Sequence, residues 1–323
     1  MTAVHDSLGL PALDGSNPIG FLAALGVLSC LDRAGVSPTL RWVDDLVPTA
    51  VLTGAASVDD VVAVIDADRT WWATKSVVFG WPKMPDVKAD PAELHKWSLA
   101  VREAWLARPD VWCLADVRLW TALVAEGALA GKGNAKPTHL HFTAGQQQFL
   151  DMARQLARSV DGEHFRQALM GPWRYDSPLP SFGWDARGDR VYALRATDPS
   201  KERRLGVPGC DWLALLGLAF LPVAARRGRL HTTGCERSWK SAPFRWPLWS
   251  VPASPHAVAG LLGDQSLASG AEAVRKAAGD YRGRGVFAVM EVPIRRTEQG
   301  GYGSFGAPTE LLRHAPPSAV HRS

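Results

Sequence analysis

The chain has 323 residues, of which 46% are hydrophobic and 21% are charged, the proportions of an ordinary globular protein. Fourteen tryptophans and ten phenylalanines exclude an intrinsically disordered chain, because so much aromatic surface requires a packed core. Four dispersed cysteines without a CxxC pair argue against a zinc cluster and a disulfide scaffold, and we expect a cytoplasmic protein without a membrane-spanning segment.

The formal net charge of +4 hides an uneven distribution of sign along the chain. Residues 1–120 carry 10 basic and 15 acidic side chains, a net charge of −5, whereas residues 174–245 carry 13 and 7, a net charge of +6. A basic segment of this kind favours a polyanionic partner, with an unevenly charged, solvated surface as the alternative.

A buried helix is the first element that the sequence predicts. Ser16 or Asn17 is suited to cap it, Pro18 suits its first turn, and Gly35 suits its end. Apolar residues occupy nearly every face between these signals, so we expect the helix to lie inside the core rather than on the surface.

Further helices dominate the sequence up to residue 170. A short strand over 39–43 precedes a helix that starts at Ser57, and an amphipathic helix is predicted over 91–107. The apolar stretch 111–125 suggests a strand followed by a helix. A Gly-rich flexible loop then leads into a short strand and a helix that starts near Thr143.

The composition changes at residue 171. Dense Pro, Gly and aromatic residues over 171–200 predict loops and β-hairpins, and a second buried helix follows over 211–228, broken near Pro222. Strands and short helices complete the chain. We therefore predict an α+β fold with a mostly helical N-terminal lobe, residues 1–170, and a basic, aromatic-rich, hairpin-containing C-terminal lobe, residues 171–323.

Linear motifs for catalysis or metal binding are missing from the sequence. The GALAGKGN stretch lacks the spacing of a phosphate-binding P-loop, and His139 and His141 have no third metal ligand at a recognisable spacing. The aspartates of the later loops do not form an obvious acid–base pair. We predict no catalytic residue, metal site or cofactor, and keep an enzyme with an unmarked active site, such as a nuclease, as an alternative.

Arginine and lysine alternate with aromatic residues through 173–249, a mixture typical of a nucleic-acid groove. Guanidinium groups bind phosphate, and aromatic faces stack on unpaired bases. The alternative is that the tryptophans belong to the core and the arginines to a solvated rim. Together with two lysines of the Gly-rich loop, the predicted nucleic-acid-binding residues are Lys132, Lys136, Arg174, Arg195, Lys201, Arg203, Arg204, Arg226, Arg227, Arg229, Arg237, Lys240 and Arg245.

Several blocks of the sequence resemble CRISPR-associated proteins of type I-G (formerly I-U) loci. They are LDGSNPIGFLAALGVLSCLDR, then HFTAGQQQFL, then WRYDSPLPSFGWDARGDRVYALRATDPS, and last TTG with RWPLWS, in this order over about residues 10–260. The resemblance implies a large-subunit-like, non-catalytic component of an RNA-guided surveillance complex in antiviral defence. Its partners would be guide RNA or target DNA and the other effector subunits, with a protein-binding adaptor of the same system as an alternative.

Overall fold

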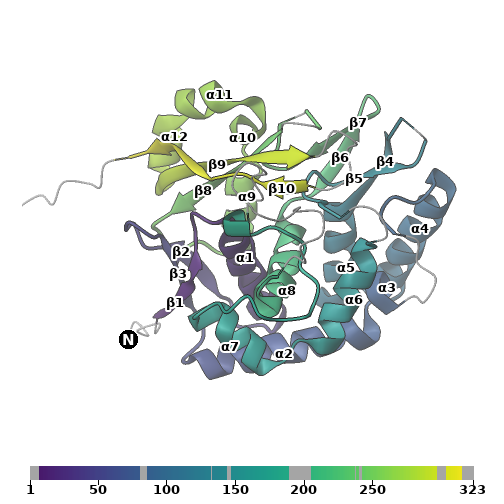
Figure 1. Cartoon of the computed structure of the whole chain (residues 1–323), viewed down its shortest axis with the longest axis horizontal. Coiled ribbons are helices and arrows are strands. Elements are labelled where there is room, and N and C mark those ends of the chain that lie inside the picture. Colours follow the sequence, from purple (N-terminus) through teal and green to yellow (C-terminus); the bar gives the residue numbers. More distant parts are fainter. Residues whose placement is uncertain are drawn as a thin grey trace, which may run out of the picture.

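A central pair of helices is surrounded by two antiparallel sheets, two β-hairpins and a layer of further helices (Figure 1). This arrangement, in a computed structural model, confirms the predicted α+β fold, with helices concentrated in the N-terminal part and sheet in the C-terminal part. The structure describes residues 7–80, 86–131, 133–143, 147–188, 205–236, 238–239, 242–296 and 303–314.

The central pair consists of α1 (Pro18–Arg33) and α8 (Pro208–Gly217), which are the two predicted buried helices. A Cβ atom on Gly26 of α1 would lie 1.9 Å from the carbonyl oxygen of Leu213 in α8. A Cβ atom on Gly217 would lie 2.0 Å from the carbonyl oxygen of Leu22. The two helix backbones are therefore in direct contact, which explains why both sequences are apolar on almost every side.

An N-terminal sheet packs against one side of α1. Its strands have the order β1-β3-β2 and are all antiparallel. Phe21 of α1 stacks on Trp42 of this sheet and also contacts Trp246 and Trp249 of the C-terminal sheet, so one aromatic cluster joins both sheets to the central helix. The strands are β1 (Ser7–Asp14), β2 (Thr39–Trp42) and β3 (Thr49–Thr53).

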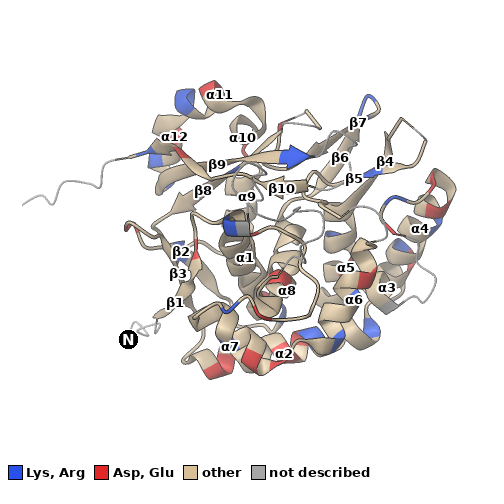
Figure 2. Ribbon diagram, viewed as in Figure 1, with Lys and Arg blue, Asp and Glu red and all other residues tan. Residues whose placement is uncertain are grey.

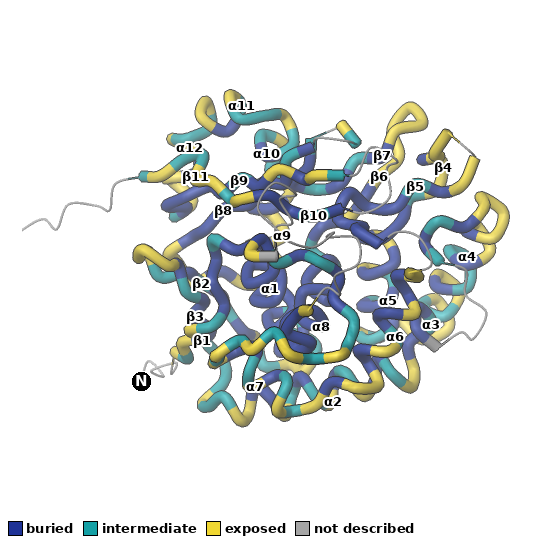
Figure 3. Tube along the Cα trace, in the orientation of Figure 1, coloured by how far each residue is buried: buried dark blue, intermediate teal, exposed yellow. Residues whose placement is uncertain are grey.

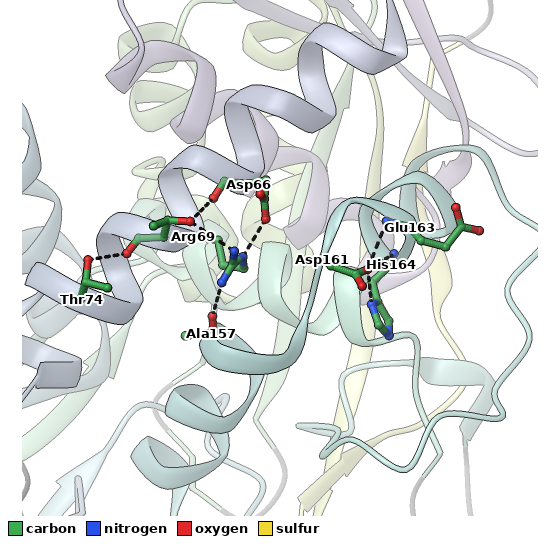
Figure 4. A network of polar contacts seen from close by, with 8 residues as sticks. Asp66, Arg69, Thr74, Ala157, Asp161, Glu163 and His164 are labelled. Carbon is green, nitrogen blue, oxygen red and sulfur yellow. Dashed lines mark hydrogen bonds and ion pairs between the residues drawn. The ribbon is translucent and has the colours of Figure 1, made fainter.

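Helices α2 to α7 form a layer below and beside the central pair in the view of Figure 1. Side chains at Ser57, Asp90, Asp110 and Asp161 accept hydrogen bonds from the first backbone N–H groups of α2, α4, α5 and α7. Arg69 of α2 donates to the carbonyl oxygen of Ala157 in α6, which joins these two helices (Figure 4). The bounds are α2 (Val58–Lys75), α3 (Val77–Gly80), α4 (Pro91–Ala107), α5 (Val111–Leu123), α6 (Phe149–Ser159) and α7 (Gly162–Met170).

The C-terminal sheet is built on the long strand β9, which pairs with β8, β10 and β11. Four short helices between β8 and β9 cover part of it (Figure 1). The strands are β8 (Pro243–Trp249), β9 (Val286–Arg296), β10 (Gly303–Phe305) and β11 (Thr309–Arg313), and the helices are α9 (Pro255–Leu262), α10 (Gln265–Ser269), α11 (Ala271–Lys276) and α12 (Ala278–Gly283).

Two hairpins lie beside the C-terminal sheet. One is formed by β4 (Val124–Leu129) and β5 (Ala135–Pro137), and the other by β6 (Val223–Arg226) and β7 (Arg229–Thr232). Ala128, Val223 and Leu230 form a small apolar cluster of their own, separate from the main core. The hairpins are therefore packed on each other as a unit at the edge of the molecule, at the right of Figure 1.

Two local predictions differ from the structure. Residues 111–129 form a helix followed by a strand, the reverse of the expected order, because Asp110 caps a helix that starts at Val111. Residues 139–142 are not a strand but a compact loop, and the next helix starts at Phe149. Within 171–188 the expected loops are an irregular segment that ends in a single 3-10 turn, Ala186–Gly188, and the rest of the segment predicted to hold hairpins, 189–200, lies outside the described residues.

One continuous core of buried apolar residues extends from Leu10 to Phe305 and includes residues of both predicted lobes (Figure 3). The central helices come from the two lobes, α1 from one and α8 from the other, and they share the middle of this core. A division of the chain at residue 171 stays a prediction. Within the described residues no helix has both the length and the apolar character needed to cross a bilayer.

Candidate nucleic-acid interface

The turn of the β6–β7 hairpin carries three of the predicted binding residues. Arg226 pairs directly with Arg229, which leaves Arg227 and Gly228 as the two turn residues. Both have a positive φ, +51° and +71°, as in the type I′ turns that suit two-residue hairpins. Gly228 adopts this backbone without cost, whereas for an arginine the left-handed region costs about 1–2 kcal/mol. Arg227 therefore occupies the tip of the hairpin in an unfavourable backbone conformation.

The two faces of the hairpin differ in chemistry. Val223 and Leu230 point toward Ala128 of β4 in the small apolar cluster. Because side chains alternate along a strand, Arg226 and Arg229 lie on the opposite face, together with His231. Two like charges directly opposite each other on paired strands repel and destabilise the pair. An anion bound between the two guanidinium groups would remove this repulsion.

The hairpin arginines lack acidic partners. All three are exposed, and none forms an ion pair with a residue that the structure describes. Elsewhere the arginines often have a carboxylate, as in the pairs Arg33–Asp68 at 2.7 Å and Arg284–Asp264 at 2.6 Å. Figure 2 shows the hairpin tip as a basic point at the edge of the molecule, away from the acidic side chains of α2 and α7. The hairpin therefore presents uncompensated positive charge to solvent.

A second group of cations surrounds Trp239 at the base of the hairpins. The guanidinium carbon of Arg296 lies 4.1 Å from the centre of the indole ring, and Nζ of Lys136 lies 4.5 Å from it. Trp239 also packs against the small apolar cluster, so this group adjoins the hairpin. Burial lowers the pKa of Arg296 to about 10, and burial followed by the charge of Arg296 lowers the pKa of Lys136. Neither cation has a carboxylate partner among the described residues.

The two histidines have structural contacts rather than the geometry of a metal site. The ring of His139 lies 2.8 Å from Oγ1 of Thr232, and that of His141 lies 2.9 Å from Oγ1 of Thr143. Burial lowers the pKa of His139 to about 3 and that of His141 well below its ordinary value, so both rings are neutral at pH 7. No group of three candidate metal ligands occurs within the described parts of the chain.

Arg245 does not belong to the exposed surface, which corrects one predicted binding residue. It is 2% exposed, and its guanidinium lies 2.6 Å from the carboxylate of Glu236 and 2.5 Å from that of Glu291. A third hydrogen bond goes to the carbonyl oxygen of Leu267. All of its donor groups are thus engaged inside the protein, and Arg245 stabilises the junction of β8, β9 and α10 instead of binding a phosphate.

The other predicted residues are distributed as follows. Arg174 is exposed in the segment that follows α7, where its neighbour Trp173 donates to the carbonyl oxygen of Ala168. It is therefore attached to a different element from the hairpin arginines. Among the described members of the predicted set, Arg226, Arg227 and Arg229 share the hairpin, and Lys136 lies beside Trp239, which adjoins it. Lys132, Arg195, Lys201, Arg203, Arg204, Arg237 and Lys240 lie outside the described residues.

Most of the aromatic residues that alternate with these cations are buried, which contradicts their predicted role in base stacking. Trp184, Trp246 and Phe244 have no exposed surface. Trp184 donates to the carbonyl oxygen of Leu140, and Trp246 donates to that of Gly15, both at 2.8 Å. For these side chains the alternative interpretation is right: they fill the core, and the arginines form the rim.

The first block quoted from the sequence, which begins α1, and the third, which includes residues 173–188, contact each other in the structure. Asn17 of the first block donates to Asp185 of the third at 2.8 Å, and its side-chain oxygen accepts from the backbone N–H of Ala186. Tyr175 donates to the same carboxylate at 2.7 Å. Asn17 is the N-cap residue of α1, yet its side chain forms no capping bond within the helix. These hydrogen bonds hold the segment 171–188 against the start of α1.

Two residues of the interface were missed by the sequence prediction. Arg296 belongs to an Arg-Arg pair at the end of β9, beyond the basic segment, and His231 follows the hairpin arginines. The Arg-Arg pair was a usable signal, but Arg296 is directed inward, because its guanidinium donates hydrogen bonds to the carbonyl oxygens of Trp239, His141 and His139. Its position beside Trp239 depends on tertiary packing.

Comparison with known proteins adds no identification. No protein-family model matches the chain, and no curated protein matches it.

Proposed function

We propose that this chain is a non-catalytic, nucleic-acid-binding subunit of an RNA-guided type I CRISPR surveillance complex. The β6–β7 hairpin would contact the backbone of the guide RNA or of the target DNA. The observation that carries the proposal is the cross-strand pair of Arg226 and Arg229, exposed and without a carboxylate partner in the described residues. A phosphate group supplies the charge that this pair lacks, and guanidinium groups bind phosphate in two-bond geometry.

The first experiment reverses the charge of the hairpin. Arg226→Glu with Arg229→Glu should weaken binding of a short RNA or DNA by at least about tenfold at low salt, because two phosphate contacts become repulsive. Fluorescence anisotropy with labelled oligonucleotides measures the dissociation constant. The control is Arg158→Glu with Arg275→Glu, an equal change in net charge at exposed positions on α6 and α11. Equal weakening by both variants, or none by the first, would contradict the proposal.

Membership of the complex needs its own experiment. The chain should be co-expressed with the effector proteins and a guide RNA of a type I-G CRISPR system. We expect it to elute from size-exclusion chromatography together with guide RNA and the other subunits. Elution with effector proteins but without any dependence on RNA or on the hairpin arginines would instead favour the protein-binding adaptor.

The geometry gives less support to a nuclease. The residues that the sequence offers for such an active site are His139, His141, Asp176, Asp185 and Asp198. The two histidines are buried and neutral, Asp185 accepts hydrogen bonds from Asn17 and Tyr175, and Asp176 is exposed in the segment 171–188. Asp198 lies outside the described residues. No acid–base pair is formed among those that are described.

A further inference from the structure

A polar groove lies beside the β6–β7 hairpin. It has a volume of about 630 Å³ and separates the β6–β7 hairpin from α10. Arg226 and His231 line the hairpin side, and Gln265, Ala268 and Ser269 line the α10 side. Ser238, which precedes Trp239, is exposed at the groove. The basic face of the hairpin is therefore one wall of an open cavity.

The acidic residue in the lining of the groove takes part in an internal ion pair. Glu236 is the one carboxylate among its described lining residues, and it lies 2.6 Å from the guanidinium of Arg245. Arg245 is buried and is shared between Glu236 and Glu291, so Glu236 is held in an internal ion pair, although the three side chains together carry a formal charge of −1. Arg226 remains without an acidic partner among the described residues. The groove thus combines a free guanidinium with hydroxyl and amide groups.

We propose that this groove accepts an unpaired nucleotide, so that the hairpin binds single-stranded rather than double-stranded nucleic acid. This inference rests on the proposed function and specifies its substrate class. Guanidinium planes stack on exposed bases, and side-chain amides and hydroxyls form hydrogen bonds with base edges. Arg226 on the hairpin side and Gln265 and Ser269 on the α10 side supply these groups.

Size and geometry favour an unpaired strand. Cavities of about 300–1,000 Å³ enclose molecules of drug size, which is the range of one or two nucleotides. A base inside a duplex is stacked and paired, so it cannot enter a side groove without being extruded at a cost of a few kcal/mol. A duplex would reach only the hairpin arginines, whereas a single strand would reach the arginines and the groove together.

The test fills the groove without changing its charge. Ala268→Trp, on the α10 wall, should weaken binding of a labelled single strand of about 12 nucleotides, (dT) or (U), by about tenfold. Binding of a duplex of the same length should change by less than about twofold, because the duplex does not use the groove. Ser238→Trp, at an exposed position of the groove lining, should have the same effect and provides a second test if Ala268→Trp fails to fold.

Ala257→Trp is the matched control, an exposed position on α9 that does not line the groove. It should leave the affinity for both oligonucleotides unchanged, and thermal unfolding confirms that each variant is folded. Equal affinity of the groove variants and the wild type for the single strand would overturn the inference. If charge reversal at Arg226 and Arg229 still weakened binding in that case, the proposed function would stand. Lack of any binding by the wild type would overturn both.

Discussion

Arg227 occupies a turn position where Asn or Gly is the usual residue. Its positive φ has an energetic cost, and its side chain adds to the positive charge of the hairpin. We expect Arg227→Asn to raise the free energy of unfolding by about 0.5–1 kcal/mol, since Asn tolerates the left-handed region better. The same variant should weaken nucleic-acid binding. Urea unfolding and anisotropy measure the two effects, and Arg275→Asn on α11 should show neither.

The two buried histidines, His139 and His141, should make the free energy of unfolding depend on pH. Their folded pKa values lie below the unfolded value of about 6.5, so below pH 6.5 the unfolded chain binds more protons than the native one. Stability is therefore fully present above pH 6.5 and falls as the pH decreases, by up to about 1.4 kcal/mol per pH unit for each histidine.

The double variant His139→Asn, His141→Gln keeps hydrogen-bonding groups near the ring nitrogens and removes the titration. It should lose less stability than the wild type between pH 6.5 and pH 5, as measured by urea unfolding. Asp116 acts in the opposite direction, because burial raises its pKa to about 6, but it is present in both proteins and cancels in the comparison. An identical pH dependence would show that the histidines do not control acid stability.

The close packing of α1 against α8 can be tested by adding a side-chain atom at their contact. Gly26→Ala would place a methyl group against the backbone of Leu213, so the two helices must separate, and we expect a loss of about 3 kcal/mol or more in unfolding free energy. Gly260→Ala in α9 is the control, because its Cβ meets open space. That variant should gain about 0.5–1 kcal/mol from helix propensity. Similar effects of both variants on urea unfolding would contradict the described contact.

Elements with strong local signals were predicted correctly. Ser57 caps the helix expected after it, and the apolar stretch after Pro18 forms the buried helix α1. Strand β1 was missed because its sequence, SLGLPALD, contains Gly and Pro and pairs with β3, about 40 residues later. The order of helix and strand after Asp110 was wrong, since a short apolar run suits either structure until its cap is considered.

At the scale of the whole molecule, the separation of charge along the sequence is partly preserved in space. Acidic side chains gather on α2 and α7, and the basic hairpin lies at another edge (Figure 2). If Lys136 and the three hairpin arginines each contact a phosphate of a single strand, the slope of log affinity against log salt should be about −3. Titrations between about 50 and 200 mM NaCl measure it, and a slope near zero would exclude phosphate contacts.

The sequence by itself determined the class of the fold, the two buried helices and the presence of a basic segment. These three features depend on the amino-acid composition and on interactions between residues close together in the sequence. Only the tertiary structure decided which cations share a surface: Arg245 is enclosed by Glu236 and Glu291, whereas Arg296 joins Lys136 at Trp239. Likewise the tryptophans of the basic segment are divided between core and surface by strand pairing and helix packing. The physical reason is that burial and ion pairing arise between residues far apart in the chain, and the local pattern of a sequence does not contain those distances.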